Sequence, residues 1–159
     1  LASGLKPARL RREAAAALNA AWIPTAVTAG YVVLGEAMAA TGAPATIAAA
    51  VANAIGPAAP YATPAFAALA GRLTGSNAAA HGMLVDLQAA IGAAAGGDPL
   101  GSVTTQNVVA SAYTMLSPMR VALVAAVLGL AGQEAAIVKR LAPFALAVLA
   151  IGWAATAVG

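Results

Sequence analysis

The sequence predicts an all-α fold, a polytopic transmembrane protein whose helices include a re-entrant hairpin and a broken span. Composition is the first reason. Of 159 residues, 62% are hydrophobic and 8% are charged, whereas soluble domains carry roughly a quarter charged residues. Eight basic and five acidic residues cannot cover the surface of a soluble domain of this length. The same hydrophobicity excludes intrinsic disorder, and the absence of Cys excludes a disulfide scaffold.

The spacing of the charges is the second reason. Residues 14–35, 37–71, 99–119 and 141–159 contain no Asp, Glu, Lys or Arg, and each interval can hold an apolar span of about 20 residues. Basic residues gather within 6–12 and at 139–140, beside the first and last apolar runs. The positive-inside rule puts both clusters on the cytoplasmic side. We expect no nucleic-acid partner, because the first cluster is short and abuts a hydrophobic span.

The first two predicted helices differ in length. The apolar run over 15–34 is long enough to cross a bilayer, so that Glu36 emerges on the outside. The run over 46–55 is too short to cross, and it lies between glycines and prolines that signal helix ends. It predicts a short interfacial or buried helix.

A re-entrant hairpin is predicted next. The apolar run over 64–73 is too short for a span and leads into the polar tetrad Thr74-Gly75-Ser76-Asn77, after which a second apolar run covers 78–95. Irregular backbone at membrane depth is tolerated only where it lines a cavity or is buried in protein. Small residues, among them Gly71 and Gly82, would let the two arms pack closely.

The remaining sequence predicts a broken span and a final intact one. Asp98 and Pro99 are helix-start residues. The stretch 102–130 is polar in its first half and apolar in its second, and Ser117-Pro118 interrupts it, since proline removes a backbone donor and clashes with the preceding turn. After a loop over 132–134, the last span covers 136–158. The first span would then lead out of the cytoplasm, and the hairpin would dip into the membrane from the outside and return. The broken span would lead back to the cytoplasmic side, and the last span would leave it again.

Two discontinuous helices are typical of secondary transporters, which bind substrate near the membrane midplane where half-helix ends meet. Ser76 or Asn77 is predicted to cap the helix that begins at 78, and Ser117 the one that begins at Pro118. Two capped N-termini at one depth would bind a carboxylate without Lys or Arg. The alternative is ordinary turns outside the membrane. The predicted substrate-binding residues are Thr74, Gly75, Ser76, Asn77, Gln88, Gln106, Asn107 and Ser117.

Two segments resemble the L-lactate permease family. The first is Gly-Arg-Leu-Thr-Gly-Ser-Asn at 71–77, followed by Leu87-Gln88. The second is Met-Leu-Ser-Pro at 115–118, followed by an apolar run to Leu130 and then Gly132 and Glu134. Together they cover roughly residues 30 to 140, in the family's order and spacing. Arg72 and Asp86 stand outside the family's usual pattern.

The resemblance implies proton-coupled uptake of lactate, glycolate or a similar 2-hydroxymonocarboxylate across the bacterial inner membrane. It also implies that residues 1–159 form a single transmembrane region, the C-terminal part of a longer permease. Carriers of similar plan have inverted repeats with two re-entrant hairpins, of which this chain would hold one.

Three titratable residues are candidates for proton coupling: His81, Asp86 and Arg72. His81 could relay a proton, or it could simply be hydrogen-bonded in place. Arg72 and Asp86 lie 14 positions apart, on opposite arms of the predicted hairpin. Because ionisable groups in a membrane are costly and usually paired, we expect them to approach each other or to open to water. Arg72 could instead face a substrate carboxylate. Glu36 and Arg120 are the other charges that could lie at depth.

Other functions stay open at this point. A non-transporting membrane subunit or assembly protein has the same composition, and a carrier could take a different small organic anion. An enzyme is not expected, because the sequence lacks Cys, HExxH and Gly-x-Ser-x-Gly motifs and has one His. We expect neither a cofactor nor a metal. The expected partners are a small organic anion, protons and the lipid bilayer, and the oligomeric state, a homodimer included, is open.

Overall fold

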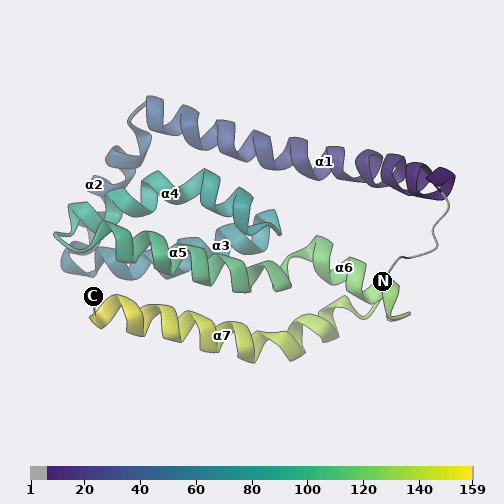
Figure 1. Cartoon of the computed structure of the whole chain (residues 1–159). Helices are drawn as coiled ribbons and strands as arrows, with labels where there is room; N and C mark the ends of the chain where they lie inside the picture. The colour runs from purple at the N-terminus through teal and green to yellow at the C-terminus, as the bar shows by residue number, and fades with distance from the viewer. Residues whose placement is uncertain (1–6, 159) are drawn as a thin grey trace.

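The predicted fold class is confirmed: the computed structural model describes residues 7–158, which form helices and no strand. Seven α-helices and two 3-10 turns follow one another along the chain (Figure 1). They are α1 (Pro7–Ala40), α2 (Ala43–Ile55), η1 (Gly56–Tyr61), α3 (Ala62–Thr74), α4 (Asn77–Ala94), α5 (Pro99–Tyr113), η2 (Thr114–Leu116), α6 (Pro118–Val127) and α7 (Glu134–Val158).

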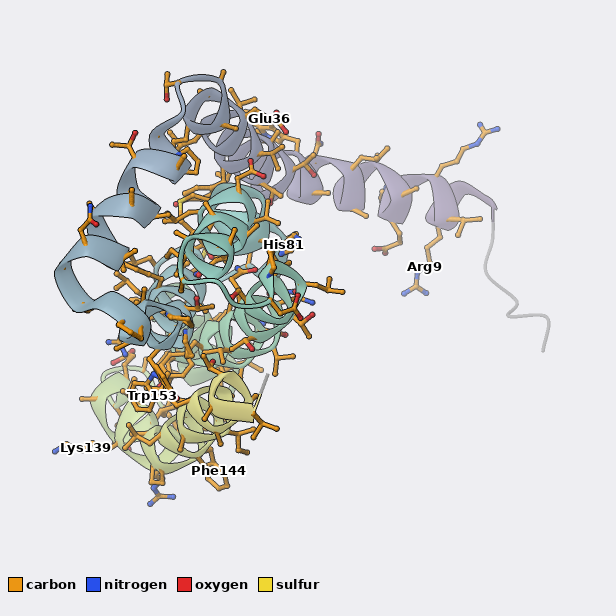
Figure 2. The ribbon with its side chains drawn as sticks, turned by 90° about the vertical axis from the view of Figure 1, so that its left-hand side faces the viewer. Arg9, Glu36, His81, Lys139, Phe144 and Trp153 are labelled. Carbon is orange, nitrogen blue, oxygen red and sulfur yellow. The ribbon has the colours of Figure 1, made fainter. Side chains whose placement is uncertain are left out.

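The helices α3, α4, α5 and α7 share one long direction, whereas α1 diverges from it and α2 crosses it (Figure 1 and Figure 2). In Figure 1, α7 runs along most of the molecule, and α5 with α6 covers a similar length, whereas the hairpin of α3 and α4 reaches only about halfway. The start of α1, the end of α6 and the start of α7 lie at one end, on the right of the view. The turn between α4 and α5 and the end of α7 lie at the other. The two basic clusters therefore belong to elements that begin at the same end.

One described helix, α7, is long and apolar enough to cross a membrane by itself, with 25 residues and a mean hydropathy of 2.0 over 18 of them. At 1.5 Å per residue it is about 37 Å long, more than a hydrocarbon core of about 30 Å. Two bent pairs meet the same criterion if each counts as one span: Thr25–Ala40 with Ala43–Thr74, bent by 73°, and Pro99–Leu116 with Pro118–Val127, bent by 45°. The second pair is the predicted broken span.

The first helix is longer than predicted. The helix α1 continues past 34 to Ala40, so that Glu36 lies inside its last turns, near the corner with α2, rather than beyond its end (Figure 2). The reason is local: residues 37–40 are Ala and Met, which are good helix formers, and the turn comes only at Gly42, where φ is +71°. Figure 2 also shows the end of α1 that carries Arg9 projecting away from the other helices.

The predicted end of the second helix at Gly56 is only partly correct. The helix α2 stops there, but the chain continues through the 3-10 turn η1 directly into α3. Pro57 lies in the first turn of η1, and Pro64 lies in the first turn of α3. The N–H groups of a first turn have no partner within the helix, so these prolines remove no hydrogen bond.

Glycines let the hairpin pack against its neighbours. A Cβ on Gly71 in α3 would clash with the carbonyl of Ala110 in α5, and one on Gly35 in α1 would clash with the carbonyl of Gly82 in α4. Gly71 and Gly82 were expected to serve contacts between the two arms, but their closest approaches are to α5 and α1. Buried side chains around them include Ala67, Ala70, Ala80, Val109 and Ala110.

Candidate functional site

The hairpin tip is built by a left-handed glycine followed by a capping serine. Gly75 has φ +63°, and its N–H donates to the carbonyl of Gly71 at 3.0 Å, which ends α3. Ser76 is extended, and its Oγ accepts from the N–H of Ala79 at 3.3 Å, which starts α4. The Thr74 hydroxyl accepts from the N–H of Ser76 at 3.2 Å. Of the two predicted caps, Ser76 is the one that the structure uses.

The break between α5 and α6 is built by Ser117 and Pro118. The chain tightens into η2 and then becomes extended at Ser117, with φ −66° and ψ 138°, as the residue before a proline prefers. Pro118 opens α6, and the Ser117 Oγ accepts from the N–H of Arg120 at 3.3 Å. The predicted serine cap of this half-helix is therefore present.

The two breaks are in contact. A Cβ added to Gly75 would lie 2.7 Å from the Oγ of Ser117, and the Nε–H of Arg120 donates to the carbonyl of Gly75 at 2.8 Å. We call this group of Gly75, Ser76, Ser117 and Arg120 the break junction. The predicted meeting of two helix N-termini is thus present in the structure, about halfway along the molecule in Figure 1.

A layer of polar side chains joins α4 to α5 next to the break junction. The Nδ2 of Asn77 donates to the Oδ1 of Asn107 at 2.6 Å, and the Nδ1 of His81 lies 2.9 Å from the Oε1 of Gln106. Two buried atoms in this layer, the Oδ1 of Asn77 and the Nε2 of Gln106, have no hydrogen-bond partner. An unpartnered buried polar atom costs about 1–3 kcal/mol, so this layer is suited to receive a polar ligand or water.

His81 is half-buried in this layer, on α4 (Figure 2). Its Nδ1 faces Gln106, whose side chain is completely buried. With Nδ1 donating to the amide oxygen, Nε2 is the nitrogen that can take up a proton. The geometry is compatible with either role considered for His81.

Gln88 is separated from the other predicted binding residues. It lies three helical turns beyond Asn77, about 16 Å along α4. Its Nε2 donates to the carbonyl of Thr63 at 3.4 Å, and both the Oε1 of Gln88 and the Oγ1 of Thr63 are buried without a partner. Gln88 and Thr63 therefore form a second polar pair, away from the break junction.

The predicted ion pair between Arg72 and Asp86 is not formed, and both side chains are exposed on the described chain. The alternative, that the two charges open to water, stays a prediction. Register explains why the ion pair is not formed. Arg72 is three residues before the hairpin tip and Asp86 is ten residues after it. Along antiparallel arms this offset amounts to about 10 Å.

Sequence reasoning missed two residues. Arg120 was noted only as a charge that could lie at depth, although its place in the first turn after Ser117-Pro118 was the available signal. Thr63 was not considered at all, and only the packing of α3 against α4 reveals its contact with Gln88.

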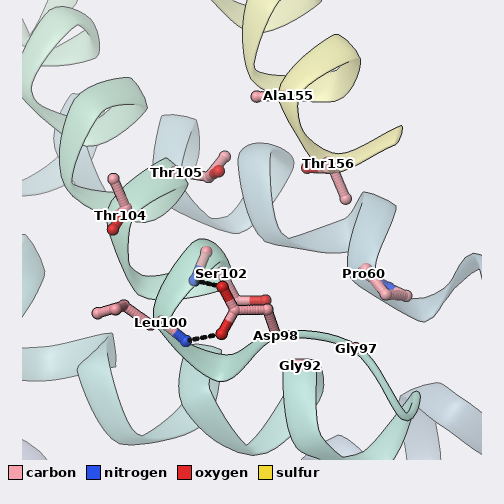
Figure 3. Close-up of a pocket in the computed structure, with 11 residues that line it drawn as sticks. Pro60, Gly92, Gly97, Asp98, Leu100, Ser102, Thr104, Thr105, Ala155 and Thr156 are labelled. Carbon is pink, nitrogen blue, oxygen red and sulfur yellow. Dashed lines mark hydrogen bonds between the residues drawn. The ribbon is translucent and has the colours of Figure 1, made fainter. Parts of the chain in front are cut away.

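A pocket of about 390 Å³ lies at the other end of the hairpin, between the turn that joins α4 to α5 and the end of α7 (Figure 3). Asp98, Ser102, Thr104 and Thr156 are among its lining residues. The Asp98 carboxylate accepts from the N–H groups of Leu100 and Gly101, at 2.9 and 2.8 Å. That carboxylate therefore caps α5, and no predicted site residue lines this pocket.

Within residues 7–158, no three His, Asp or Glu side chains lie close enough together to hold a metal ion.

The comparisons with known proteins agree with the two sequence segments that resemble the L-lactate permease family. No curated protein and no solved structure matches the chain significantly. The family model for L-lactate permease matches residues 3–158, nearly the whole chain, and permeases transport rather than catalyse. The chain therefore belongs to the L-lactate permease family and is a membrane-embedded lactate transport protein.

Proposed function

We propose that the protein carries lactate, glycolate and similar 2-hydroxymonocarboxylates together with protons, and that the substrate carboxylate binds at the break junction. The observation that carries this proposal is the contact of Gly75 with Ser117, which brings two helix N-termini together. The bacterial inner membrane, crossed several times, is the proposed location, with the basic ends of α1 and α7 on the cytoplasmic side.

Helix starts favour an anion for two reasons. The first N–H groups of α4 and α6 have no carbonyl partner within their helices, and each helix dipole places about half a positive charge at its start. Ser76 and Ser117 satisfy one N–H each, at Ala79 and Arg120. The N–H groups of Asn77 and Ala78 in α4 and that of Met119 in α6 are left for a ligand, since Pro118 has none. Each charge-assisted hydrogen bond to a carboxylate contributes roughly 1.5–3 kcal/mol.

The neighbouring polar layer supplies partners for the 2-hydroxyl group of the substrate. Asn77, Asn107 and Gln106 offer amide donors and acceptors, and two of their buried atoms are unpartnered. Thr74, whose hydroxyl braces Ser76, completes the hairpin side of the site. Gln88 lies farther along α4 and is proposed to line the path of the substrate.

Proton coupling is proposed to depend on His81. Its Nδ1 contact with Gln106 places it in the same layer as the proposed substrate hydroxyl partner, so a proton on its Nε2 and a bound substrate can influence each other. Asp86 and Arg72 lie on exposed faces of α4 and α3 and are the other candidates for this coupling.

Uptake of labelled lactate and glycolate by vesicles that contain the whole protein, with a pH gradient present or absent, tests the proposal. We expect uptake of both acids, stimulated by a gradient that is acidic on the outside. Ser76→Leu should abolish uptake, whereas Ser111→Leu, the same change on an exposed face of α5, should not.

Each part of the proposal has its own contrary result. No uptake of any 2-hydroxymonocarboxylate contradicts the substrate class. Uptake that ignores the pH gradient contradicts proton coupling. Unchanged uptake by Ser76→Leu contradicts the placement of the site.

A further inference from the structure

Arg120 is the one charged residue of the break junction. Its backbone N–H donates to the Oγ of Ser117 at 3.3 Å, and its Nε–H donates to the carbonyl of Gly75 at 2.8 Å. The first bond ties it to the start of α6 and the second ties it to the hairpin tip, 45 residues away in sequence. Its guanidinium is therefore held where the two broken helices meet.

That bond occupies only part of the guanidinium. The two terminal amino groups make no hydrogen bond to any residue that the structure describes, and no described Asp or Glu forms an ion pair with Arg120. A guanidinium at membrane depth without a counter-charge is costly, and that of Arg120 is exposed on the described chain, where a ligand can reach it. Its planar fork of N–H groups matches a carboxylate and binds it through two parallel hydrogen bonds.

We propose that Arg120 binds the carboxylate of the substrate through its terminal amino groups and thereby selects ionised 2-hydroxy acids over neutral analogues. This inference rests on the proposed function and adds a charged anchor to it. The Oδ1 of Asn77, two residues after Gly75, is buried without a partner and is an acceptor for a substrate hydroxyl. A carboxylate bound to Arg120 would be linked to α6, because Arg120 is part of that helix, and to the end of α3, because Arg120 is hydrogen-bonded to Gly75.

Arg72, the other arginine near the tip, lacks this geometry. It is exposed in the last turn of α3, as Arg120 is at the start of α6, but it makes no hydrogen bond to either break among the described residues. Arg120 is bonded to both. The two arginines are therefore separable by experiment.

The test compares Arg120→Gln, Arg120→Lys and Arg72→Gln, with Arg140→Gln on an exposed position of α7 as the control for loss of a guanidinium. Labelled lactate uptake is measured in vesicles that contain the whole protein, with lactate and its neutral amide, lactamide, as competitors. Arg120→Gln should raise the KM for lactate by about tenfold to hundredfold, as expected for one charge-assisted contact. It should also remove the preference for lactate over lactamide. Arg120→Lys should restore part of that preference, and Arg140→Gln should behave like the unmodified protein.

A purely structural role for Arg120 predicts something else. Loss of the Gly75 bond alone would lower the maximal rate and the melting temperature, but it would leave the KM and the lactate preference unchanged. That result overturns the inference, as does a loss of preference in Arg72→Gln instead of Arg120→Gln. Failure of the unmodified protein to carry lactate contradicts the proposed function itself.

A measurement on the unmodified protein covers the case in which Arg120→Gln does not fold. Phenylglyoxal modifies accessible guanidinium groups, and mass spectrometry of the peptide that contains Arg120 reports the extent of modification. Lactate should protect Arg120 several-fold and lactamide should not. Equal modification with and without lactate overturns the inference.

Discussion

The break at the hairpin tip reverses the chain, whereas the break between α5 and α6 bends it by only 45°. Both breaks start a new helix on a serine whose Oγ accepts from the N–H three residues later, at 3.3 Å in each case. They differ in the residue beside the serine. Gly75 precedes Ser76 with φ +63°, and Pro118 follows Ser117. A serine cap thus starts a helix, while its neighbour sets the direction in which the chain leaves.

The largest effect is expected from a Cβ at the tip. Gly75→Ala places a side chain in the left-handed region, which costs about 1–2 kcal/mol, and brings its Cβ within 2.7 Å of the Ser117 Oγ. Crowding of this kind adds about 1–3 kcal/mol. The free energy of unfolding of the protein in detergent, measured with a denaturant, should therefore fall by roughly 3 kcal/mol.

Two matched variants separate these causes. Gly42 also has φ +71° but has nothing within 4 Å of its Cβ position, so Gly42→Ala should show only the backbone cost. Gly30 is helical with open space around it, and Gly30→Ala should stabilise α1 by about 0.5–1 kcal/mol. Equal losses for Gly75→Ala and Gly42→Ala would mean that the two breaks are not in tight contact.

The second effect distinguishes the two serines. Removing a helix cap costs about 1 kcal/mol, so Ser76→Ala should lower the free energy of unfolding by that amount. Ser117→Ala should cost about half as much, because Pro118 already holds the first helical φ of α6. Denaturant unfolding of both variants is the measurement, and an equal or reversed order would show that Pro118 does not support its break.

Much of this arrangement could be predicted from short-range patterns. The polar tetrad between two apolar runs predicts arms over 64–73 and 78–95, and the helices are Ala62–Thr74 and Asn77–Ala94. Ser117-Pro118 likewise predicts the second break. The contact of Arg120 with Gly75 could not be predicted, since it joins residues 45 apart and depends on how the hairpin docks on α5. The predicted ion pair of Arg72 with Asp86 failed for a related reason. Whether two residues on opposite arms meet depends on how far each lies from the tip, and their separation of 14 positions in the sequence does not give that.

The smallest effect is expected at Thr63 and Gln88, the polar pair that lies away from both breaks. It tests whether a buried polar group is important only when it adjoins a break. Thr63 is 1% exposed and Gln88 is 0% exposed, yet their one mutual bond is long, at 3.4 Å, and the Thr63 hydroxyl has no partner. Thr63→Val keeps the shape and removes the unpaired hydroxyl, so the free energy of unfolding should rise by about 0.5–1 kcal/mol. Thr46→Val on the exposed face of α2, where the hydroxyl donates to the Gly42 carbonyl, should change little. A loss of stability in Thr63→Val would show that an ordered water or ion satisfies this pair. Buried polar groups far from the breaks would then stabilise the protein as much as those beside them.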